Sequence, residues 1–253
     1  MVPTRLGPRC AVLARMNPDA NNASAKARSR RPPDAPSSLS RSITSIASVT
    51  AIEVFADIWC PFAHLGLRTV IQQRSTLGRD DVLLRVHAWP LELINHGPLD
   101  PSMTANHVDE LRSQVAPDLF AGFDERRFPR TTLPALALAA AAHRTDARTG
   151  EAVSLALRDA LFERGYDISD PQVLTGIATA HGLPAPGPGD ERQVLTDWKD
   201  GQSRGVKGSP HFFCGQVESF CPALSMARDE SGHLHIHRDA EALDRFLAEC
   251  LTG

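Results

Sequence analysis

A cysteine at the start of an expected helix is the strongest chemical signal in the sequence. Residues 51–58 are mostly apolar and are typical of a buried strand, and Cys60-Pro61 follows directly. Proline is favoured in the first turn of a helix, so we expect Cys60 at a helix N-terminus. The unpaired N–H groups and the helix dipole there favour a thiolate over a thiol. The sequence therefore predicts a sulfur that is ionised and reactive near neutral pH.

The residues beside Cys60 could influence its sulfur, and one competing interpretation assigns the cysteine no chemistry. His64 lies four residues after Cys60, on the same face of the expected helix, and could donate a hydrogen bond or a positive charge to the sulfur. Pro61 and Phe62 are the other candidates for the local surface beside the sulfur. In the competing interpretation Cys60 is a buried small side chain without chemistry, as free cysteines commonly are.

A second segment with chemical potential lies about 150 residues later. Ser209-Pro210 directly precedes the apolar residues 211–214. Proline gives no N–H to a sheet, and X-Pro bonds are the only common place for cis peptide geometry. On its own, this segment predicts only a turn before a strand.

The elements that must position these residues follow from hydrophobic periodicity and turn signals. A strand at 82–89 would complete a strand-helix-strand unit whose crossover favours parallel pairing. The later part of the chain is expected to be helical from 101 to 205, with strands and a final helix after it. The expected helices are 103–115, 132–145, 150–164, 170–181, 191–204 and 239–251, and the later strands are 211–214, 217–220 and 233–237.

Composition limits the function classes. The chain has 253 residues, 42% hydrophobic and 23% charged, and no apolar stretch long enough to cross a bilayer, so a soluble protein without a membrane partner is expected. Residues 1–49 carry a net charge of +6 and residues 50–253 a net charge of −9. The acidic body argues against nucleic acid as a partner. Residues 1–49 show no export signal and are expected to be a disordered leader, an overlong start or a transit-like peptide.

The cysteines indicate the compartment. There are five, widely spaced, which does not suggest a disulfide framework, so we expect a reducing, cytoplasmic location. Cys250 is expected in the core, and Cys10 lies in the leader. The high Ala and Arg content suggests a bacterial source. Three histidines alternate within residues 233–237, but no fourth ligand is nearby, so we expect a solvated strand face and no metal.

Together, these segments resemble the thioredoxin superfamily, in particular its DsbA-like branch with FrnE-type proteins, 2-hydroxychromene-2-carboxylate isomerases and kappa-class glutathione transferases. Residues 57–66 look like the family's Cys-Pro-Trp-Cys-Tyr-x-Gly segment, 89–93 like its Trp-x-Pro-Phe-x-Leu strand end, and 208–210 like its Gly-x-Pro loop. The resemblance covers about residues 52–251. It implies an α/β thioredoxin-like fold (50–100 and 206–253) interrupted by an all-helical insertion domain (101–205).

The resemblance also implies roles for residues. A cis-proline at Pro210, with Ser209 before it, would face the active-site sulfur and hold a substrate in extended form. Trp89 would line the cleft or lie in the core, and we favour the cleft. Cys221 would border the cleft and could resolve an adduct on Cys60. Alternatively, Cys221 pairs with Cys214 across the hairpin, or both stay packed thiols.

The sequence departs from the family pattern at two places. Ala63 replaces the second cysteine of Cys-x-x-Cys, so a lone thiolate could form a mixed disulfide but another thiol must resolve it. Glutathione-using relatives have a Gly-x-Asp-Arg-like segment where this chain has residues 220–224, with neither Asp nor Arg. Glutathione binding in the family manner is therefore not expected.

The expected function is that of a DsbA-like thiol oxidoreductase acting through Cys60 on a small-molecule or protein thiol or disulfide. No resident cofactor is expected; a low-molecular-weight thiol would serve as co-substrate, and a homodimer is an open possibility. One rival is an isomerase or thiol transferase acting on a small aromatic or electrophilic substrate. The other is a non-catalytic binding module that kept the fold.

Overall fold

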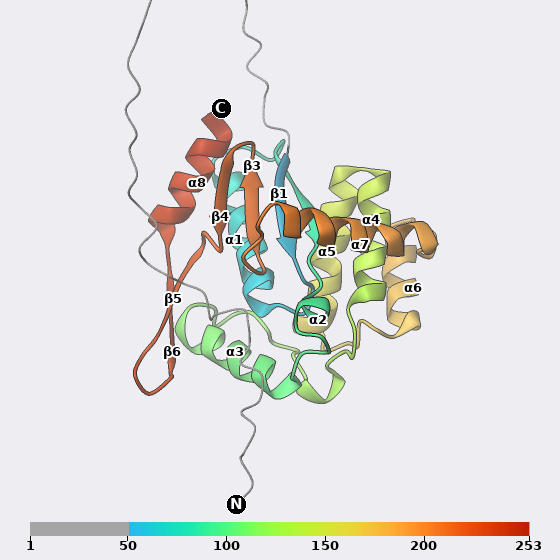
Figure 1. The fold of residues 1–253 in the computed structure, drawn as a ribbon, viewed down its shortest axis with the longest axis horizontal. Helices are drawn as coiled ribbons and strands as arrows, with labels where there is room; N and C mark the ends of the chain where they lie inside the picture. Colours follow the sequence, from blue (N-terminus) through green and yellow to red (C-terminus); the bar gives the residue numbers. More distant parts are fainter. Residues whose placement is uncertain (1–50, 253) are drawn as a thin grey trace, which may run out of the picture. The chain divides into compact units, whose positions relative to one another are not determined.

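A computed structural model describes residues 51–252, so the expected leader, with Cys10, lies outside the described residues. Figure 1 shows the elements in chain order. They are β1 (Ala51–Ala56), α1 (Pro61–Thr76), β2 (Leu83–Ala88), α2 (Leu91–Ile94), α3 (Pro101–Gln114), a short 3-10 turn (Glu125–Arg127), α4 (Leu133–Thr145), α5 (Ala147–Phe162), α6 (Pro171–Ala180), α7 (Pro188–Ser203), β3 (His211–Cys214), β4 (Val217–Phe220), β5 (Leu224–Arg228), β6 (Leu234–Arg238) and α8 (Ala240–Thr252).

The main sheet has the strand order β2-β1-β3-β4. Strand β1 runs parallel to β2 and antiparallel to β3, which in turn pairs antiparallel with β4. Because Phe55 near the end of β1 is opposite His211 at the start of β3, the residues just after β1 and just before β3 meet at one edge of the sheet. This pairing brings together two segments that are 150 residues apart in sequence.

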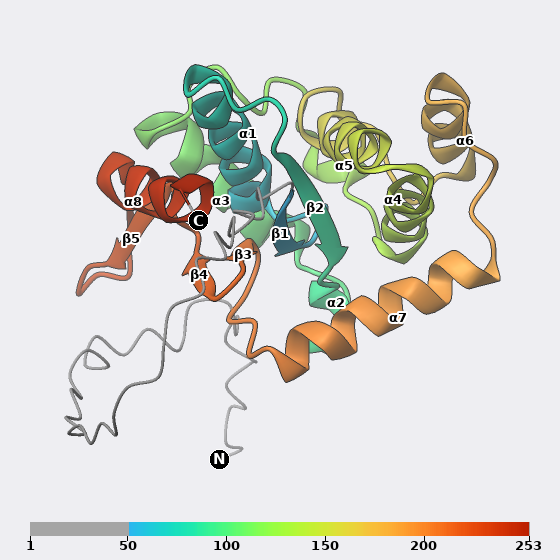
Figure 2. The ribbon, with the colours of Figure 1, turned by 90° about the horizontal axis from the view of Figure 1, so that it is seen from above.

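Helices cover both faces of this sheet. Figure 2 shows α1 and α8 on one side and α7 crossing the other, with α4, α5 and α6 grouped beside β2. The first turns of the long helices follow local rules, since Asp100, Asp146 and Asp170 each accept a backbone N–H as N-cap residues. The alanines of α4, from Ala135 to Ala142, are buried against α5 and α7. Small side chains there let the helices approach closely, which fixes the helical segment beside the sheet.

A buried ion pair joins this helical segment to the sheet and to α1. The Arg74 guanidinium donates two hydrogen bonds of 2.6 Å to the two carboxylate oxygens of Glu151. The same carboxylate accepts the backbone N–H of Leu84 at 2.6 Å. Such a fork-to-fork contact fixes orientation as well as distance, so α1, α5 and β2 are locked in one arrangement.

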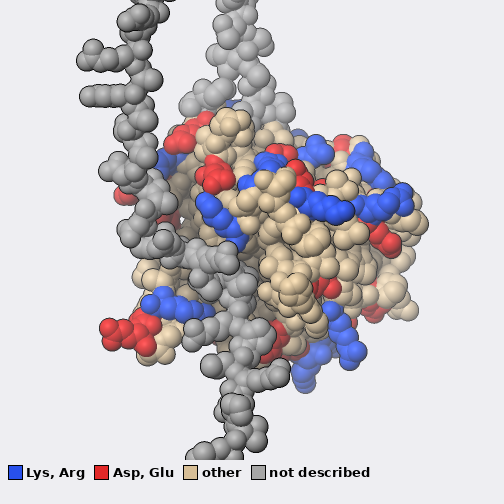
Figure 3. Space-filling model, viewed as in Figure 1, with Lys and Arg blue, Asp and Glu red and all other residues tan. Residues whose placement is uncertain are grey.

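The α/β thioredoxin-like fold with a helical insertion is the predicted one. Helices α3 to α7 begin and end within a few residues of the expected ranges, and β3 and β4 match them. Three elements were not predicted, the single turn α2, the 3-10 turn Glu125–Arg127 and the strand β5, which pairs with β6 in a separate two-stranded sheet. No helix within residues 51–252 is long and apolar enough to cross a membrane. On the face shown in Figure 3, acidic and basic side chains are interspersed.

Candidate active site

Cys60 lies where the sequence placed it, as the N-cap residue of α1 with Pro61 in the first turn. Its Sγ donates a hydrogen bond to the backbone oxygen of Ser209 at 3.1 Å. The Ser209–Pro210 peptide bond is cis. The Ser209 hydroxyl in turn accepts the backbone N–H of Asp57 at 2.9 Å. The sulfur, the serine and the proline therefore form one contact at the edge of the sheet.

The helix start packs tightly over Pro210. Gly66, in the second turn of α1, is so close that a Cβ placed on it would come within 3.3 Å of the Pro210 ring. Any larger residue would have to displace that ring. Ser209 and Pro210 are both buried, so this junction is closed in the structure.

The expectation of an ionised Cys60 is wrong for this closed form. The side chain is only 3% exposed. Burial raises the pKa of Cys60 to about 11, against the opposing effect of the helix N–H groups at Phe62 and Ala63. The nearby Asp57 carboxylate raises this pKa further. The prediction failed because the helix N-terminus lowers the pKa of the thiol by less than the removal of water raises it.

Two charged residues that sequence reasoning missed lie next to Cys60. Asp57 is fully buried, with its two carboxylate oxygens accepting the N–H groups of Ile58 and Leu91 at 2.6 Å each. Burial raises the pKa of Asp57 to about 6. The signal in the sequence for a buried carboxylate here was a charged residue at the end of an apolar strand.

Arg158 of α5 is the second missed residue. It is 0% exposed and donates to the backbone oxygens of Ser154 at 2.8 Å and of Asp57 at 3.2 Å. Burial lowers the pKa of Arg158 to about 10, although the charges of Asp57 and Cys60 oppose that shift. A guanidinium therefore lies near enough to the candidate sulfur for their charges to interact, and it partly balances the buried carboxylate. No pattern in the sequence distinguishes this arginine from the others on helices.

His64 does not assist Cys60, which corrects the prediction. Its Nε2 pairs with Glu163 at 2.6 Å, and its ring packs against Phe120 and Phe162. Burial lowers the pKa of His64 despite this carboxylate. Glu163 also accepts the backbone N–H of Phe120 at 2.9 Å. His64 is therefore a neutral, structural contact between α1 and the helical segment.

Cys221 lies on the other side of the cis-proline loop. Its N–H donates to the backbone oxygen of Pro210 at 3.1 Å, and its own oxygen accepts from Leu224 at 3.1 Å. Its φ of 51° falls in the left-handed region, which costs energy for a residue other than glycine. It is 3% exposed, and burial together with the nearby Cys60 raises its pKa. Both cysteines thus bond to consecutive residues of one loop, Ser209 and Pro210.

Of the alternatives for Cys221, the disulfide with Cys214 across the hairpin is not formed, and both residues are buried free thiols. Cys214 lies opposite Val217 in the β3–β4 register, whereas Cys221 follows the end of β4. The thiols of Cys60, Cys214, Cys221 and Cys250 are all free. The cysteines therefore form two separate pairs. Cys60 and Cys221 lie at the cis-proline loop, and Cys214 and Cys250 lie at the far end of β3.

The expected substrate contacts are buried in this structure. Phe62 packs 5.2 Å from the ring of His107 on α3, and Pro61 is also buried. Trp89 is 5% exposed and packs edge-on against Phe55. A Cβ on Gly201 of α7 would come within 2.5 Å of the Trp89 ring, so only glycine fits there. Trp89 is therefore core between the sheet and α7, which corrects the expectation that it lines the cleft.

Comparison with known proteins identifies the family. A family model, described as the DSBA-like thioredoxin domain, matches residues 51–229. The chain belongs to this family. No curated protein matches the sequence.

Solved structures share the fold of this DSBA-like domain. A protein from Nitrosomonas europaea, provisionally assigned as a protein disulfide isomerase, has a TM-score of 0.54 and 14% identity over 80% of this chain and 97% of its own. The cytosolic disulfide reductase DsbM from Pseudomonas aeruginosa has a TM-score of 0.50 and 15% identity, with the same coverage of 80% and 97%. A 2-hydroxychromene-2-carboxylate isomerase has a TM-score of 0.49 and 14% identity over 67% of this chain and 88% of its own.

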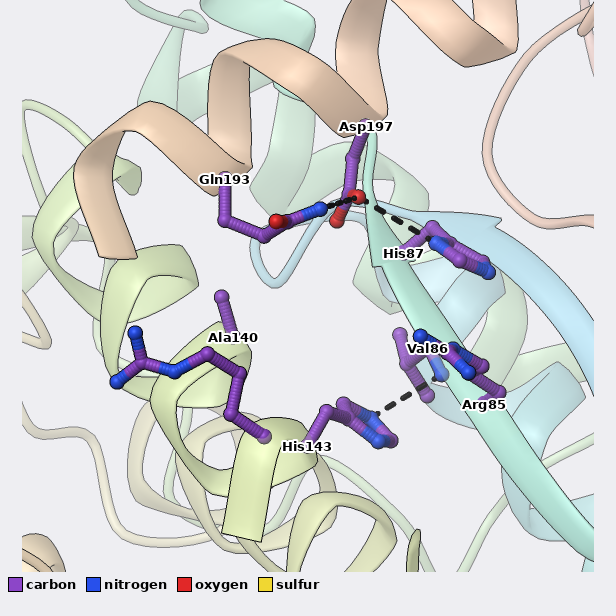
Figure 4. A pocket seen from close by; sticks show the side chains of 8 residues that line it. Arg85, Val86, His87, Ala140, His143, Gln193 and Asp197 are labelled. Carbon is purple, nitrogen blue, oxygen red and sulfur yellow. Dashed lines mark hydrogen bonds and ion pairs between the residues drawn. The ribbon is translucent and has the colours of Figure 1, made fainter. Parts of the chain in front are cut away.

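A second polar cluster of the DSBA-like chain lies between β2, α4 and α7, around a cavity of about 100 Å³ (Figure 4). His87 has carboxylates on both sides, Glu53 Oε1 at 3.1 Å from Nε2 and Asp197 Oδ1 at 3.5 Å from Nδ1. Burial opposes protonation, but the two carboxylates raise the pKa of His87. Asp197 also accepts from Gln193 and from Ala88 N. Because these groups hydrogen-bond and form ion pairs with one another, we interpret the cluster as a structural polar contact between the sheet and α7.

The raised pKa of Cys60 in this DSBA-like chain gives a direct prediction. We expect the rate of Cys60 alkylation by iodoacetamide to rise about tenfold per pH unit from 7 to 9.5 without a plateau, since only the thiolate reacts and its pKa is about 11. Mass spectrometry of the Cys60 peptide measures the rate. In urea the same cysteine should level off near its ordinary pKa. A plateau by pH 8 in the folded chain would show that the site is open and ionised.

Proposed function

We propose that the chain is a thiol–disulfide oxidoreductase in which Cys60 attacks the substrate and Cys221 completes the cycle. The observation that carries the proposal is the position of Cys60 Sγ, 3.1 Å from the oxygen of Ser209 and directly before the cis bond to Pro210. A backbone carbonyl beside a reactive sulfur is an acceptor for the N–H of an extended substrate chain. In the closed form the thiol itself occupies that acceptor, so we expect this form to be inactive.

Substrate binding would activate the sulfur by competition. A thiol that donates to a carbonyl is held in its neutral form. When a substrate N–H takes the Ser209 oxygen, the neutral form of Cys60 loses its partner. Arg158, fully buried near the site, favours the thiolate that remains. At a pKa of about 11, roughly one molecule in 10⁴ carries the thiolate at pH 7, so this activation step is required.

The chemical steps balance as follows. The Cys60 thiolate attacks one sulfur of the substrate disulfide, the S–S bond breaks, and the leaving thiolate takes a proton. The Cys221 thiolate then attacks Cys60 Sγ in the mixed disulfide and releases the second substrate thiol. Two molecules of a low-molecular-weight thiol reduce the resulting Cys60–Cys221 disulfide and become its oxidised form. This co-substrate implies a reducing compartment, for which we propose the cytoplasm.

The side chain of Cys221 supports its part in these steps. A cysteine in the left-handed region costs about 1 kcal/mol or more relative to an unstrained backbone, and the chain has a cysteine there instead of glycine. Its sulfur is close enough to Cys60 for the two charges to interact. The second cysteine of the Cys-x-x-Cys pattern, which is Ala63 here, is not needed if the Cys221 thiol resolves the mixed disulfide.

Three observations bear on the rival functions. The near-complete burial of Cys60 is also what a non-catalytic binding module would show. Replacement of the second cysteine by Ala63 suits an isomerase or thiol transferase. Trp89, which was expected to line the cleft for an aromatic substrate, is buried, and this counts against the isomerase or transferase.

Two assays separate these functions. In the first, the full chain is incubated with a peptide that holds one disulfide, plus reduced glutathione, and the reduced peptide and oxidised glutathione are followed by chromatography. In the second it is incubated with 1-chloro-2,4-dinitrobenzene and glutathione. We expect turnover in the first assay alone. Turnover in the second alone supports the transferase, and turnover in neither supports the binding module; each of these results contradicts our proposal.

A further inference from the structure

A second pair of thiols lies at the far end of β3. Cys214 ends this strand, four residues beyond Pro210, which places it roughly 13 Å along the strand from the cis-proline loop. Its Sγ is 3.8 Å from the backbone oxygen of Cys250 on α8. Burial raises the pKa of Cys250, and the nearby Cys214 thiol raises it further. No step of the proposed reaction uses either sulfur.

The contact has a simple origin in the helix end. The last four carbonyls of a helix have no partner within it, and Cys250 is two residues before the end of α8. The Cys214 thiol supplies a donor to this carbonyl. The two side chains therefore converge because one caps the helix that carries the other.

The surrounding packing holds this pair together. Phe246 of α8 packs edge-on against Phe212 of β3, with ring centres 5.9 Å apart. Gln73 of α1 donates to Asp244 at 2.7 Å and ties the outer face of α8 to the same layer. A disulfide needs the sulfurs at about 2.05 Å, so the Cys214 sulfur, 3.8 Å from the backbone oxygen of Cys250, must turn toward the Cys250 sulfur to form the bond.

We propose that Cys214 and Cys250 form a reversible disulfide, a redox modification site distinct from the cis-proline loop. The oxidant is a low-molecular-weight disulfide. The Cys214 thiolate attacks one of its sulfurs, the S–S bond breaks and one thiolate leaves with a proton. The Cys250 thiolate then attacks Cys214 Sγ, forms the new S–S bond and releases the second thiol. Two protein thiols are oxidised and one external disulfide is reduced to two thiols.

Access to the site depends on α8. Cys214 is 7% exposed and Cys250 is 1% exposed, so the oxidant cannot reach them while α8 is docked. Local opening of a single helix has a lower free energy than unfolding of the whole domain. Oxidation is therefore faster when α8 is loosened. Once formed, the bond ties α8 to β3 and encloses β4, β5 and β6 in one covalent loop, which restricts the unfolded chain.

The test uses the full chain with Cys60→Ala and Cys221→Ala, which removes the other two described thiols. The protein is equilibrated with glutathione at different ratios of disulfide to thiol, and free thiols are then blocked. Trypsin cuts after Lys207, Arg228 and Arg245, so the expected product is peptide 208–228 joined to peptide 246–253. We expect this product to increase with the disulfide ratio, and faster in 1 M urea.

The thermal midpoint provides an independent readout. We expect it to rise by roughly 5 °C in the oxidised form, and not to change in a Cys250→Ser control under the same conditions. Cys214→Ser is a second control if the first folds poorly. Recovery of both thiols as blocked, reduced residues, even in urea, would overturn the proposal. So would a glutathione adduct on Cys214 that never proceeds to the joined peptides. Neither result bears on Cys60 chemistry, which this variant lacks.

Discussion

Replacing Cys60 with alanine is expected to lower the rate of disulfide turnover about 10³-fold or more. In the proposed reaction this sulfur makes and breaks the only bond to the substrate, so its removal eliminates the covalent step. The change deletes one buried atom and leaves the hydroxyl contact between Ser209 and Asp57 in place. The measurement is the initial rate at which a disulfide peptide is converted to its reduced form, separated by chromatography, with glutathione as co-substrate.

The matched control is Cys214→Ala, a buried cysteine on β3 outside the cis-proline loop. It should keep the rate within about twofold. Cys221→Ser should instead accumulate a mixed disulfide between Cys60 and the peptide, visible by mass spectrometry. If Cys60→Ala turned over the peptide as fast as the unmodified chain, the proposed oxidoreductase would be rejected.

Replacing Arg158 with methionine is expected to lower the free energy of unfolding by about 3–5 kcal/mol at pH 7.5, because removal of one partner leaves a buried charge uncompensated. Methionine fills much of the volume but cannot donate to the oxygens of Ser154 and Asp57. The Asp57 carboxyl would then be ionised without its nearby cation. Urea unfolding followed by circular dichroism measures the loss.

The pH dependence of this loss distinguishes lost charge from lost packing. The folded pKa of Asp57, about 6, lies above its ordinary value of 3.8, so ionisation of this residue costs stability as pH rises through that window. Arg158 offsets that cost. The loss should therefore be larger at pH 7.5 than at pH 4, where Asp57 is protonated. An equal loss at both pH values would contradict the electrostatic explanation, and the exposed Arg164→Met should change stability by less than about 0.5 kcal/mol.

The sequence predicts the fold better than it predicts the site. Strong periodicity and turn residues identify α3 to α7 within a few residues, since Asp and Pro at the helix starts are local signals. The segment that forms β5 has no alternation typical of a strand, and it is a strand because β6 pairs with it. The position of Cys60 opposite Pro210 follows from the recognised order of motifs and from the antiparallel register of β1 and β3.

Burial is what the sequence could not supply. A helix N-terminus and a cysteine are visible in one dimension, but the loss of water around Cys60 depends on segments from elsewhere in the chain. His64 has the spacing of a catalytic partner, yet Glu163, about 100 residues later, takes its ring nitrogen. The cation near Cys60 comes from the middle of α5, where Arg158 has no distinctive neighbours in sequence. Long-range electrostatics of this kind require the folded structure.

The distance along the chain between Cys60 and Pro210 has a consequence during synthesis on the ribosome. At about 5–20 residues per second, the strand that covers the sulfur emerges roughly 10–30 s after the cysteine. Throughout that interval the nascent thiol is in water and has the acidity of an ordinary cysteine. The newly made chain is therefore more vulnerable to capture by cellular oxidants than the folded protein, and its protection is established only once β3 has emerged and paired with β1.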